Sequence, residues 1–281
     1  MFEAGALAHF TGAYPDHPAT MDHDLVGHPL LSLPRLTVLA GSIPRYDVSL
    51  RPADLDIDQY DEQIPLEDLS PAALTQGLAV GRTLIQLCDI GEERDYKAMG
   101  LDILRPLRPL LKASGERAIA PQTHIHLAPP KAKLPFHLET IHRLYLQVRG
   151  SATVHLFDSR DPKIVSGPTW ERAYKEGRIS LPYSEKLSDA ATLYDLNEGT
   201  ALYLPPGTPN WIQHGADVSI GLCLRWQSPI SLEMAACYGM HSILREKGLA
   251  QRPTKGGWRQ RLKAQGYAWL NQNKGRNSPT V

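Results

Sequence analysis

Residues 117–228 consist of short apolar segments separated by turns, and this pattern restricts the fold more than any other feature of the chain. Short strands that follow one another at intervals of about eight to twelve residues are typical of an all-β barrel or sandwich. We therefore predict an antiparallel barrel for residues 117–228. Its predicted strands are Ala118–Leu127, Phe136–Gln147, Ala152–Phe157, Thr192–Leu196, Ala201–Leu204, Asn210–His214 and Val218–Trp226.

The segments on either side of this barrel have a more helical pattern. In residues 1–116, Ser70 and Pro71 have the pattern of a helix start, and residues 95–112 form an amphipathic helix that Pro106 and Pro109 are expected to break. Short strands are expected near residues 46–50 and 83–90. After Pro229 the helical period returns, so residues 229–281 are predicted to form C-terminal helices that pair in a homodimer.

The composition is that of a globular protein with a substantial core. The chain has 281 residues, of which 42 % are hydrophobic, and its 30 basic and 30 acidic residues cancel. No global charge attracts nucleic acid or a membrane surface, so neither is an expected partner. The N-terminus lacks the pattern of a secretory signal, no apolar run is long enough to span a bilayer, and the three cysteines are widely spaced. We expect a cytoplasmic protein with buried thiols.

A candidate metal site begins at His137 and Glu139, which are two residues apart on one predicted strand. Side chains at positions i and i+2 of a strand share one face. Imidazole and carboxylate groups together bind iron(II) and other divalent metals. The pair therefore indicates a site on the inner face of the barrel.

Four motifs in order resemble the JmjC-like cupins, a family of barrel oxygenases that includes asparaginyl hydroxylases and cupin-like regulators. The resemblance covers most of the chain. It implies a double-stranded β-helix, flanked by helices, that binds iron(II) and 2-oxoglutarate and hydroxylates a small molecule or a peptide side chain. The motifs are Phe136-His-Leu-Glu139 with His142, Leu146–Ser151, Leu204–Trp211 and Val218–Leu224.

By this resemblance His137 and Glu139 occupy the metal-binding pair, and the chain departs from the family at the third ligand. Asn210 stands where the family has its distal histidine, and an amide oxygen is a poorer iron ligand than imidazole. His214 lies four residues further on, about 13 Å along an extended strand, so it replaces the missing ligand only if the strand bends.

The co-substrate positions also differ from the family pattern. Leu134 and Ala152 stand where many relatives have a threonine and a lysine for the distal carboxylate, and Arg143 replaces an asparagine. Alternation along the last strand places Arg225 on the same face as Cys223, inside the barrel. Because guanidinium groups bind carboxylates in a bidentate manner, Arg225 or Arg143, with Tyr145, is expected to hold the oxo acid.

For three histidines near these motifs, the sequence gives weaker evidence of a place in the metal site. His142 faces away from His137 by strand alternation, so a structural role is expected for it. His124 and His126 share one face of the preceding strand and could enter the cavity. The polar insertion Asp158–Ser188 is expected to be a lid or binding loop.

Three functions remain open at this point. The first is an iron(II)/2-oxoglutarate oxygenase in which His137 and Glu139 hold the metal, Asn210 or a water completes its ligand shell, and Arg225 or Arg143 holds the oxo acid. The second is a cupin that has lost redox chemistry and serves as a ligand-binding or regulatory module, because the distal histidine, the threonine and the lysine are all replaced. The third is a metal-dependent cupin that does not use 2-oxoglutarate.

Overall fold

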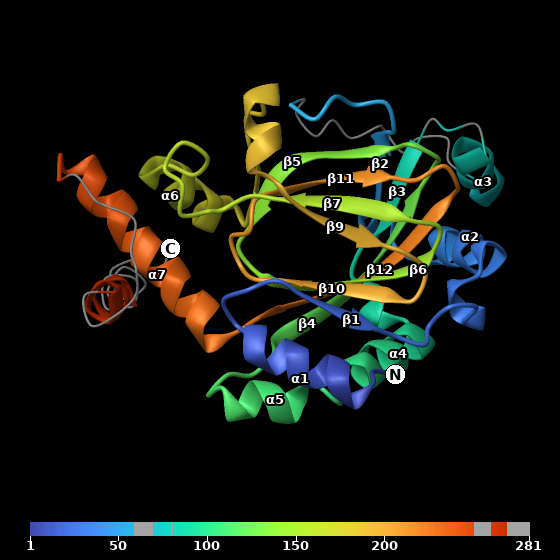
Figure 1. The fold of residues 1–281 in the computed structure, drawn as a ribbon, viewed down its shortest axis with the longest axis horizontal. Coiled ribbons are helices and arrows are strands. Elements are labelled where there is room, and N and C mark those ends of the chain that lie inside the picture. The colour runs from blue at the N-terminus through green and yellow to red at the C-terminus, as the bar shows by residue number, and fades with distance from the viewer. Residues whose placement is uncertain (59–69, 80, 82, 250–259, 269–281) are drawn as a thin grey trace, which may run out of the picture.

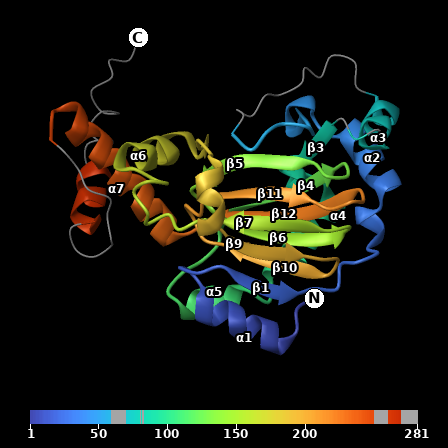
Figure 2. The same cartoon turned by 45° about the horizontal axis from the view of Figure 1, so that its top comes forward.

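The computed structural model describes residues 1–58, 70–79, 81, 83–249 and 260–268. Two antiparallel sheets face each other, one with the strand order β1-β10-β6-β12-β4-β3-β2 and the other with the order β8-β5-β11-β7-β9 (Figures 1 and 2). The strands are β1 (Ala19–Asp22), β2 (Val48–Pro52), β3 (Thr83–Leu87), β4 (Ile119–Ala128), β5 (Lys133–Glu139), β6 (His142–Arg149), β7 (Ala152–Leu156), β8 (Arg178–Ser180), β9 (Thr192–Leu196), β10 (Thr200–Leu204), β11 (Asn210–His214) and β12 (Ser219–Gln227).

Helices cover the outer face of the larger sheet and one end of the molecule. Helices α1, α4 and α5 lie beneath the larger sheet, whereas α6 and α7 stand together beyond the ends of the strands (Figure 1). The first three strands come from residues before 117, so the N-terminal region supplies sheet as well as helices. The helices are α1 (Ala4–Ala13), α2 (Leu33–Ser42), α3 (Pro71–Ala79), α4 (Arg94–Leu104), α5 (Arg108–Ala113), α6 (Gly167–Glu176) and α7 (Pro229–Glu246).

Most predicted strands and helices are confirmed, with one correction in the central segment. The single strand expected over Phe136–Gln147 is two strands, β5 and β6, joined by a tight turn at Thr140 and Ile141. This turn contains neither glycine nor proline, so the sequence carries no local signal for it. The helix expected over residues 95–112 is divided into α4 and α5 around Pro106, as predicted. Of the region 229–281, where C-terminal helices are expected, residues 229–246 and 260–268 are helical, while residues 250–259 and 269–281 lie outside the described residues.

Successive side chains of β6 point to opposite faces of the sheet and so belong to two different hydrophobic cores. Leu144 and Leu146 point outward and pack with side chains of α1, α2 and α4, while Tyr145 points inward between the sheets with Leu204 and Ile212. The other face of the smaller sheet is covered by aromatic side chains near α6. The interior between the sheets is therefore apolar around Tyr145, Leu204 and Ile212 and becomes polar at Arg143.

His142 lies on the outward face of β6 and is fully buried in a hydrogen-bonded network. Tyr203 Oη donates to the Pro15 carbonyl at 3.1 Å, so it accepts from His142 Nδ1 at 2.7 Å, and Ser228 Oγ then donates to His142 Nε2 at 2.9 Å. Both ring nitrogens are satisfied while the imidazole is neutral. The structural role expected for His142 is confirmed.

Buried neutral histidines make the stability of this protein depend on pH. Burial lowers the pKa of His124 and His142 to about 3 and that of His214 to about 4. An unfolded chain protonates these groups near their ordinary pKa, so the folded state loses stability as the pH falls from about 6.5 toward 4. Each such group contributes up to about 1.4 kcal/mol per pH unit in that range.

We expect the His142→Gln variant to have a smaller slope of unfolding free energy against pH, by about 1.4 kcal/mol per pH unit between pH 6 and about 4. Urea denaturation at several pH values measures this slope. The His17→Gln variant, which changes an exposed loop histidine, serves as the control and should keep the wild-type slope. A wild-type slope in His142→Gln would show that His142 is not held neutral.

Candidate functional site

The three side chains predicted to hold a metal meet inside the barrel. His137 and Glu139 lie on β5, and Asn210 lies on the neighbouring strand β11 in direct register with His137. The His137 Nε2 atom is 3.5 Å from Glu139 Oε1 and 3.3 Å from Asn210 Nδ2. All three residues are buried. The three side chains that the family resemblance assigns to the metal site therefore lie close together.

The guanidinium group of Arg143 lies at the point where these three side chains converge. Its Nη1 atom is 3.2 Å from His137 Nε2, 3.4 Å from Asn210 Oδ1 and 3.5 Å from Glu139 Oε1. His137 Nδ1 lies 2.8 Å from the Pro135 carbonyl, an acceptor, so Nδ1 carries the proton and Nε2 accepts from Arg143. A cation that belongs to the chain itself thus contacts all three atoms that would bind a metal.

Two further arginines surround Glu139. Arg225 Nη2 donates to Glu139 Oε2 at 2.8 Å, and Arg178 Nε lies 3.5 Å from Glu139 Oε1. Arg225 is directly opposite Arg143 in the β6–β12 ladder, an unfavourable pair of like charges unless a carboxylate lies between them. Although burial opposes ionisation, Arg225 and Arg143 hold the pKa of Glu139 well below its usual range. Glu139 is therefore a charged carboxylate shared by three guanidinium groups.

The imidazole of His137 is neutral in this environment. Burial and the positive charge of Arg178 lower the pKa of His137 to about 4, although Glu139 acts in the opposite direction. A neutral imidazole adds no positive charge beside the guanidinium groups. It provides Nε2 as a hydrogen-bond acceptor.

This set of residues does not fit a catalytic iron site. The described part of the chain contains no cluster of three or more histidine, cysteine, aspartate and glutamate side chains that could hold a metal ion. His214, the other candidate third ligand, lies at the far end of β11 in register with Ala152 and not beside His137. The positive guanidinium group of Arg143 also opposes a second cation at the same point.

A cavity of about 310 Å³ opens beside these residues, and we call it the barrel cavity. Tyr145 and Cys223 line it, as the strand alternation predicts. Four arginines and one glutamate are among the described residues that line it. The polar residues that line it are Tyr46, Ser49, Arg51, Gln86, Cys88, His126, His137, Glu139, Arg143, Tyr145, Arg178, Asn210, Cys223 and Arg225.

Several buried polar atoms of the barrel cavity have no hydrogen-bond partner among the described residues. They are Ser49 Oγ, Arg143 Nε and Arg225 Nε, and all three residues line the cavity. A buried donor without an acceptor costs about 1–3 kcal/mol. Three such donors around one cavity are what a bound anion with several oxygen atoms would satisfy.

Several residues of the barrel cavity were not predicted from the sequence, among them two from β2, one from β3 and one from β8. Ser49 and Arg51 come from β2, Gln86 from β3 and Arg178 from the short strand β8 inside the insertion. Alternation on the predicted strand near residues 46–50 is a signal for the pairing of Ser49 with Arg51 on one face. No local pattern indicates that Arg178 pairs with Glu139 in the β5–β8 ladder.

The histidines of β4 have different surroundings. His126 lines the barrel cavity and lies against Tyr145, with ring centroids 5.7 Å apart. His124 Nδ1 is 3.1 Å from Gln86 Nε2, which is a structural contact. Of the two histidines that could enter the cavity, only His126 lines it. Neither belongs to a group that could hold a metal in the described part of the chain.

Comparison with protein-family models and with curated protein sequences gives no match. Among solved structures, the fold is similar to that of YcfD from Escherichia coli, with a TM-score of 0.54 and 15 % identity over 95 % of this chain and 67 % of that chain. The structure of YcfD, a ribosomal oxygenase, in complex with cobalt and 2-oxoglutarate gives a TM-score of 0.54 at 14 % identity, over 98 % of this chain and 69 % of that one. The structure of YcfD in complex with cobalt and succinic acid gives a TM-score of 0.53 at 14 % identity, over 98 % of this chain and 69 % of that one.

These similarities show a cupin-like architecture, as the sequence motifs indicate. The chain spans about two thirds of the length of the YcfD chains it resembles. At this level of identity the likeness is one of fold. Within the described residues, no helix has the length and apolar character that a membrane span requires.

Proposed function

We propose that this protein is a cupin-like binding module that holds a small organic anion in the barrel cavity without a metal. The observation that carries the proposal is the position of Arg143 Nη1, within 3.2–3.5 Å of His137, Asn210 and Glu139. The guanidinium group supplies the positive charge that a metal would supply. It cannot accept additional ligands in open coordination positions, which oxygen chemistry at iron requires.

The charge of the barrel cavity supports an acidic ligand. Four arginines and one glutamate are among the described residues that line the cavity, and the guanidinium groups of Arg143 and Arg225, which lie opposite each other around Glu139, favour a ligand with negative groups. Guanidinium groups bind carboxylates through paired hydrogen bonds, and the unsatisfied Nε atoms of Arg143 and Arg225 provide donors of this kind. A volume of about 310 Å³ suits a small molecule better than a peptide.

The ligands observed in YcfD support the same class of ligand for this chain. YcfD, whose fold is similar, has been observed with 2-oxoglutarate and with succinic acid, both of which are small dicarboxylates. In this chain such a ligand would be held by arginines from β6 and β12 and by residues of β2. We therefore propose a dicarboxylate or a short oxo acid.

An iron(II)/2-oxoglutarate oxygenase is the second candidate function. It is favoured by the convergence of His137, Glu139 and Asn210 and by the fold of YcfD, which was observed with cobalt. This function would require Arg143 to leave its present contacts. It predicts metal-dependent formation of succinate from 2-oxoglutarate, which the metal-free binding module does not produce.

Calorimetric titration of the full chain with succinate, 2-oxoglutarate and butyrate, with and without a chelator, tests the first proposal. We expect saturable binding of the two dicarboxylates, weaker binding of the monocarboxylate and no effect of the chelator. Because Arg225 borders the cavity, the Arg225→Gln variant should bind the dicarboxylates about 10-fold to 100-fold more weakly.

The Arg149→Gln variant is a matched control for this experiment. Arg149 lies on the same strand as Arg143 but is exposed and does not line the cavity. Its dicarboxylate affinity should equal that of the wild type. Binding that appears only after iron or cobalt is added, together with turnover to succinate, would overturn the metal-free proposal in favour of the oxygenase.

A further inference from the structure

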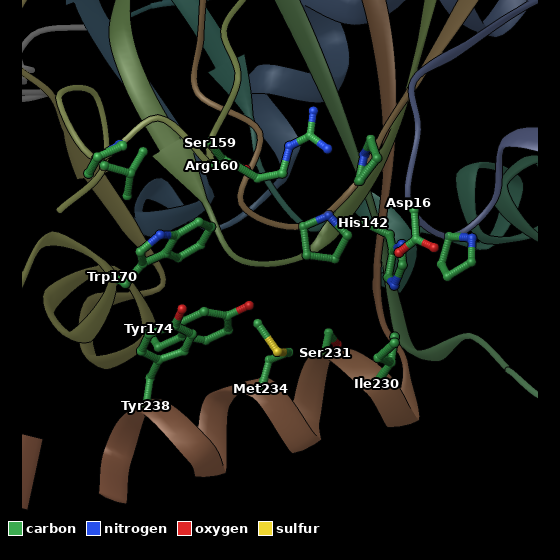
Figure 3. A pocket seen from close by; sticks show the side chains of 15 residues that line it. Asp16, His142, Ser159, Arg160, Trp170, Tyr174, Ile230, Ser231, Met234 and Tyr238 are labelled. Carbon is green, nitrogen blue, oxygen red and sulfur yellow. The ribbon is translucent and has the colours of Figure 1, made fainter. Parts of the chain in front are cut away.

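A second and larger pocket, which we call the aromatic pocket, lies between α6, α7 and the end of the barrel. Its volume is about 720 Å³, which is within the range of cavities that bind small organic molecules. Figure 3 shows Trp170 and Tyr174 on one side of this space, Met234 and Ser231 of α7 below it, and Ser159 and Arg160 above it. None of its lining residues belongs to the barrel cavity.

The two cavities are separated by the turn after β10. Pro205 and Pro206 line the aromatic pocket, whereas Leu204 and Asn210, on either side of this turn, line the barrel cavity. The turn is tightly held, because Gly207 N donates to the Glu139 carbonyl at 2.6 Å. A ligand in the aromatic pocket is therefore outside the arginine cluster.

Three nearly parallel rings form one wall of the aromatic pocket. The rings of Trp170 and Tyr238 are 5.6 Å apart at 19°, those of Tyr174 and Tyr238 are 5.0 Å apart at 8°, and those of Trp170 and Tyr174 are 5.9 Å apart at 24°. Offset stacks with these spacings are the preferred arrangement of aromatic rings. Since Met234 and the two prolines provide further apolar surface, a flat ring is the ligand shape that extends this wall.

The charges at the mouth of the aromatic pocket favour a positive group. Arg160 lines the mouth, but its guanidinium group is paired with Asp158 at 2.9 Å. Asp16, on the opposite side, is exposed and has no ion pair with any described residue. The mouth therefore has a net negative charge above an aromatic wall, and both features attract a cation.

We propose that the aromatic pocket is a second binding site, for a flat aromatic molecule that carries a cationic nitrogen. The ring packs beside Trp170 and Tyr174, and the nitrogen faces the carboxylate of Asp16. The ligand differs in both shape and charge from the anion of the barrel cavity. This inference does not depend on the function proposed for that cavity.

Three probes with one indole ring and different charges test the site: tryptamine, indole and indole-3-acetate. Calorimetric titration of the full chain is expected to give the affinity order tryptamine, then indole, then indole-3-acetate. The cationic and anionic probes should differ by about tenfold or more. No saturable binding of tryptamine by the folded protein, or equal affinity for all three probes, would overturn the proposal.

Two variants locate the bound probe. Met234→Trp fills the pocket and should abolish tryptamine binding while succinate binding in the barrel cavity is retained. Asp16→Asn should weaken tryptamine binding by about three- to tenfold and leave indole binding unchanged. Asp217→Asn, which changes an exposed carboxylate outside both cavities, is the control and should match the wild type.

Circular dichroism establishes that each variant is folded. If Met234→Trp does not fold, Ile230→Trp provides the same block from the rim, where Ile230 is 37 % exposed. Tryptamine binding that survives either folded blocking variant would place the probe elsewhere and overturn the assignment. Loss of tryptamine binding with retention of succinate binding would support two separate sites.

Discussion

In the Glu139→Gln variant, we expect the free energy of unfolding to fall by about 3–5 kcal/mol relative to the wild type. Glu139 is the carboxylate that Arg143, Arg178 and Arg225 share inside the barrel. Its neutral replacement would remove the negative charge between the guanidinium groups of Arg143 and Arg225, which lie opposite each other in the β6–β12 ladder. Urea denaturation at pH 7 measures the loss.

The double variant Glu139→Gln with Arg143→Gln is the control for this result. Removal of one buried positive charge together with the carboxylate should recover part of the lost stability, so the two changes are not additive. Succinate should also stabilise Glu139→Gln more than it stabilises the wild type, because its carboxylates replace the missing counter-charge. A loss of less than about 1 kcal/mol in Glu139→Gln would contradict the shared-carboxylate arrangement.

Metal binding should appear when Arg143→Asn and Asn210→His are combined. The first change removes the guanidinium group from the point of convergence, and the second introduces an imidazole in register with His137. Together with His137 and Glu139 this would give the two-histidine, one-carboxylate set that binds iron(II) and cobalt(II). Cobalt(II) titration followed by visible absorption should show saturable binding in the double variant and none in the wild type up to millimolar metal.

The two single variants separate the contributions of charge and ligand. Asn210→His alone retains the Arg143 cation and should bind cobalt(II) weakly or not at all, while Arg143→Asn alone lacks the third strong ligand. Tight metal binding by the wild type, with the same affinity as the double variant, would refute the proposal that Arg143 takes the place of a metal. In that case the oxygenase would become the better supported function.

The barrel and the inward direction of its site residues follow from local patterns. Alternation along a strand is set by the geometry of the backbone, so His137 and Glu139 had to share a face wherever that strand lies. The same reasoning placed Arg225 beside Cys223 inside the barrel, and both line the cavity. The turn between β5 and β6 could not be predicted, because Thr140 and Ile141 carry no turn preference that outweighs the apolar run around them.

The chemistry of the site could not be read from the sequence in the same way. From the sequence Arg143 is a candidate for holding an oxo acid, and only the distances to His137, Asn210 and Glu139 show that it lies where these three side chains converge. The position of Arg178 beside Glu139 depends on how the insertion folds back onto β5. The aromatic pocket likewise depends on how α6 packs against α7.

The sequence by itself therefore determined the strand periodicity, the cupin-like fold and the residues that face inward. The tertiary structure alone decided that an arginine lies where His137, Glu139 and Asn210 converge and that arginines from remote strands share one glutamate. The physical reason is the range of the interactions: side-chain direction along a strand is a local property of the backbone, whereas the charge around a buried point is the sum over segments that only the closed barrel brings together.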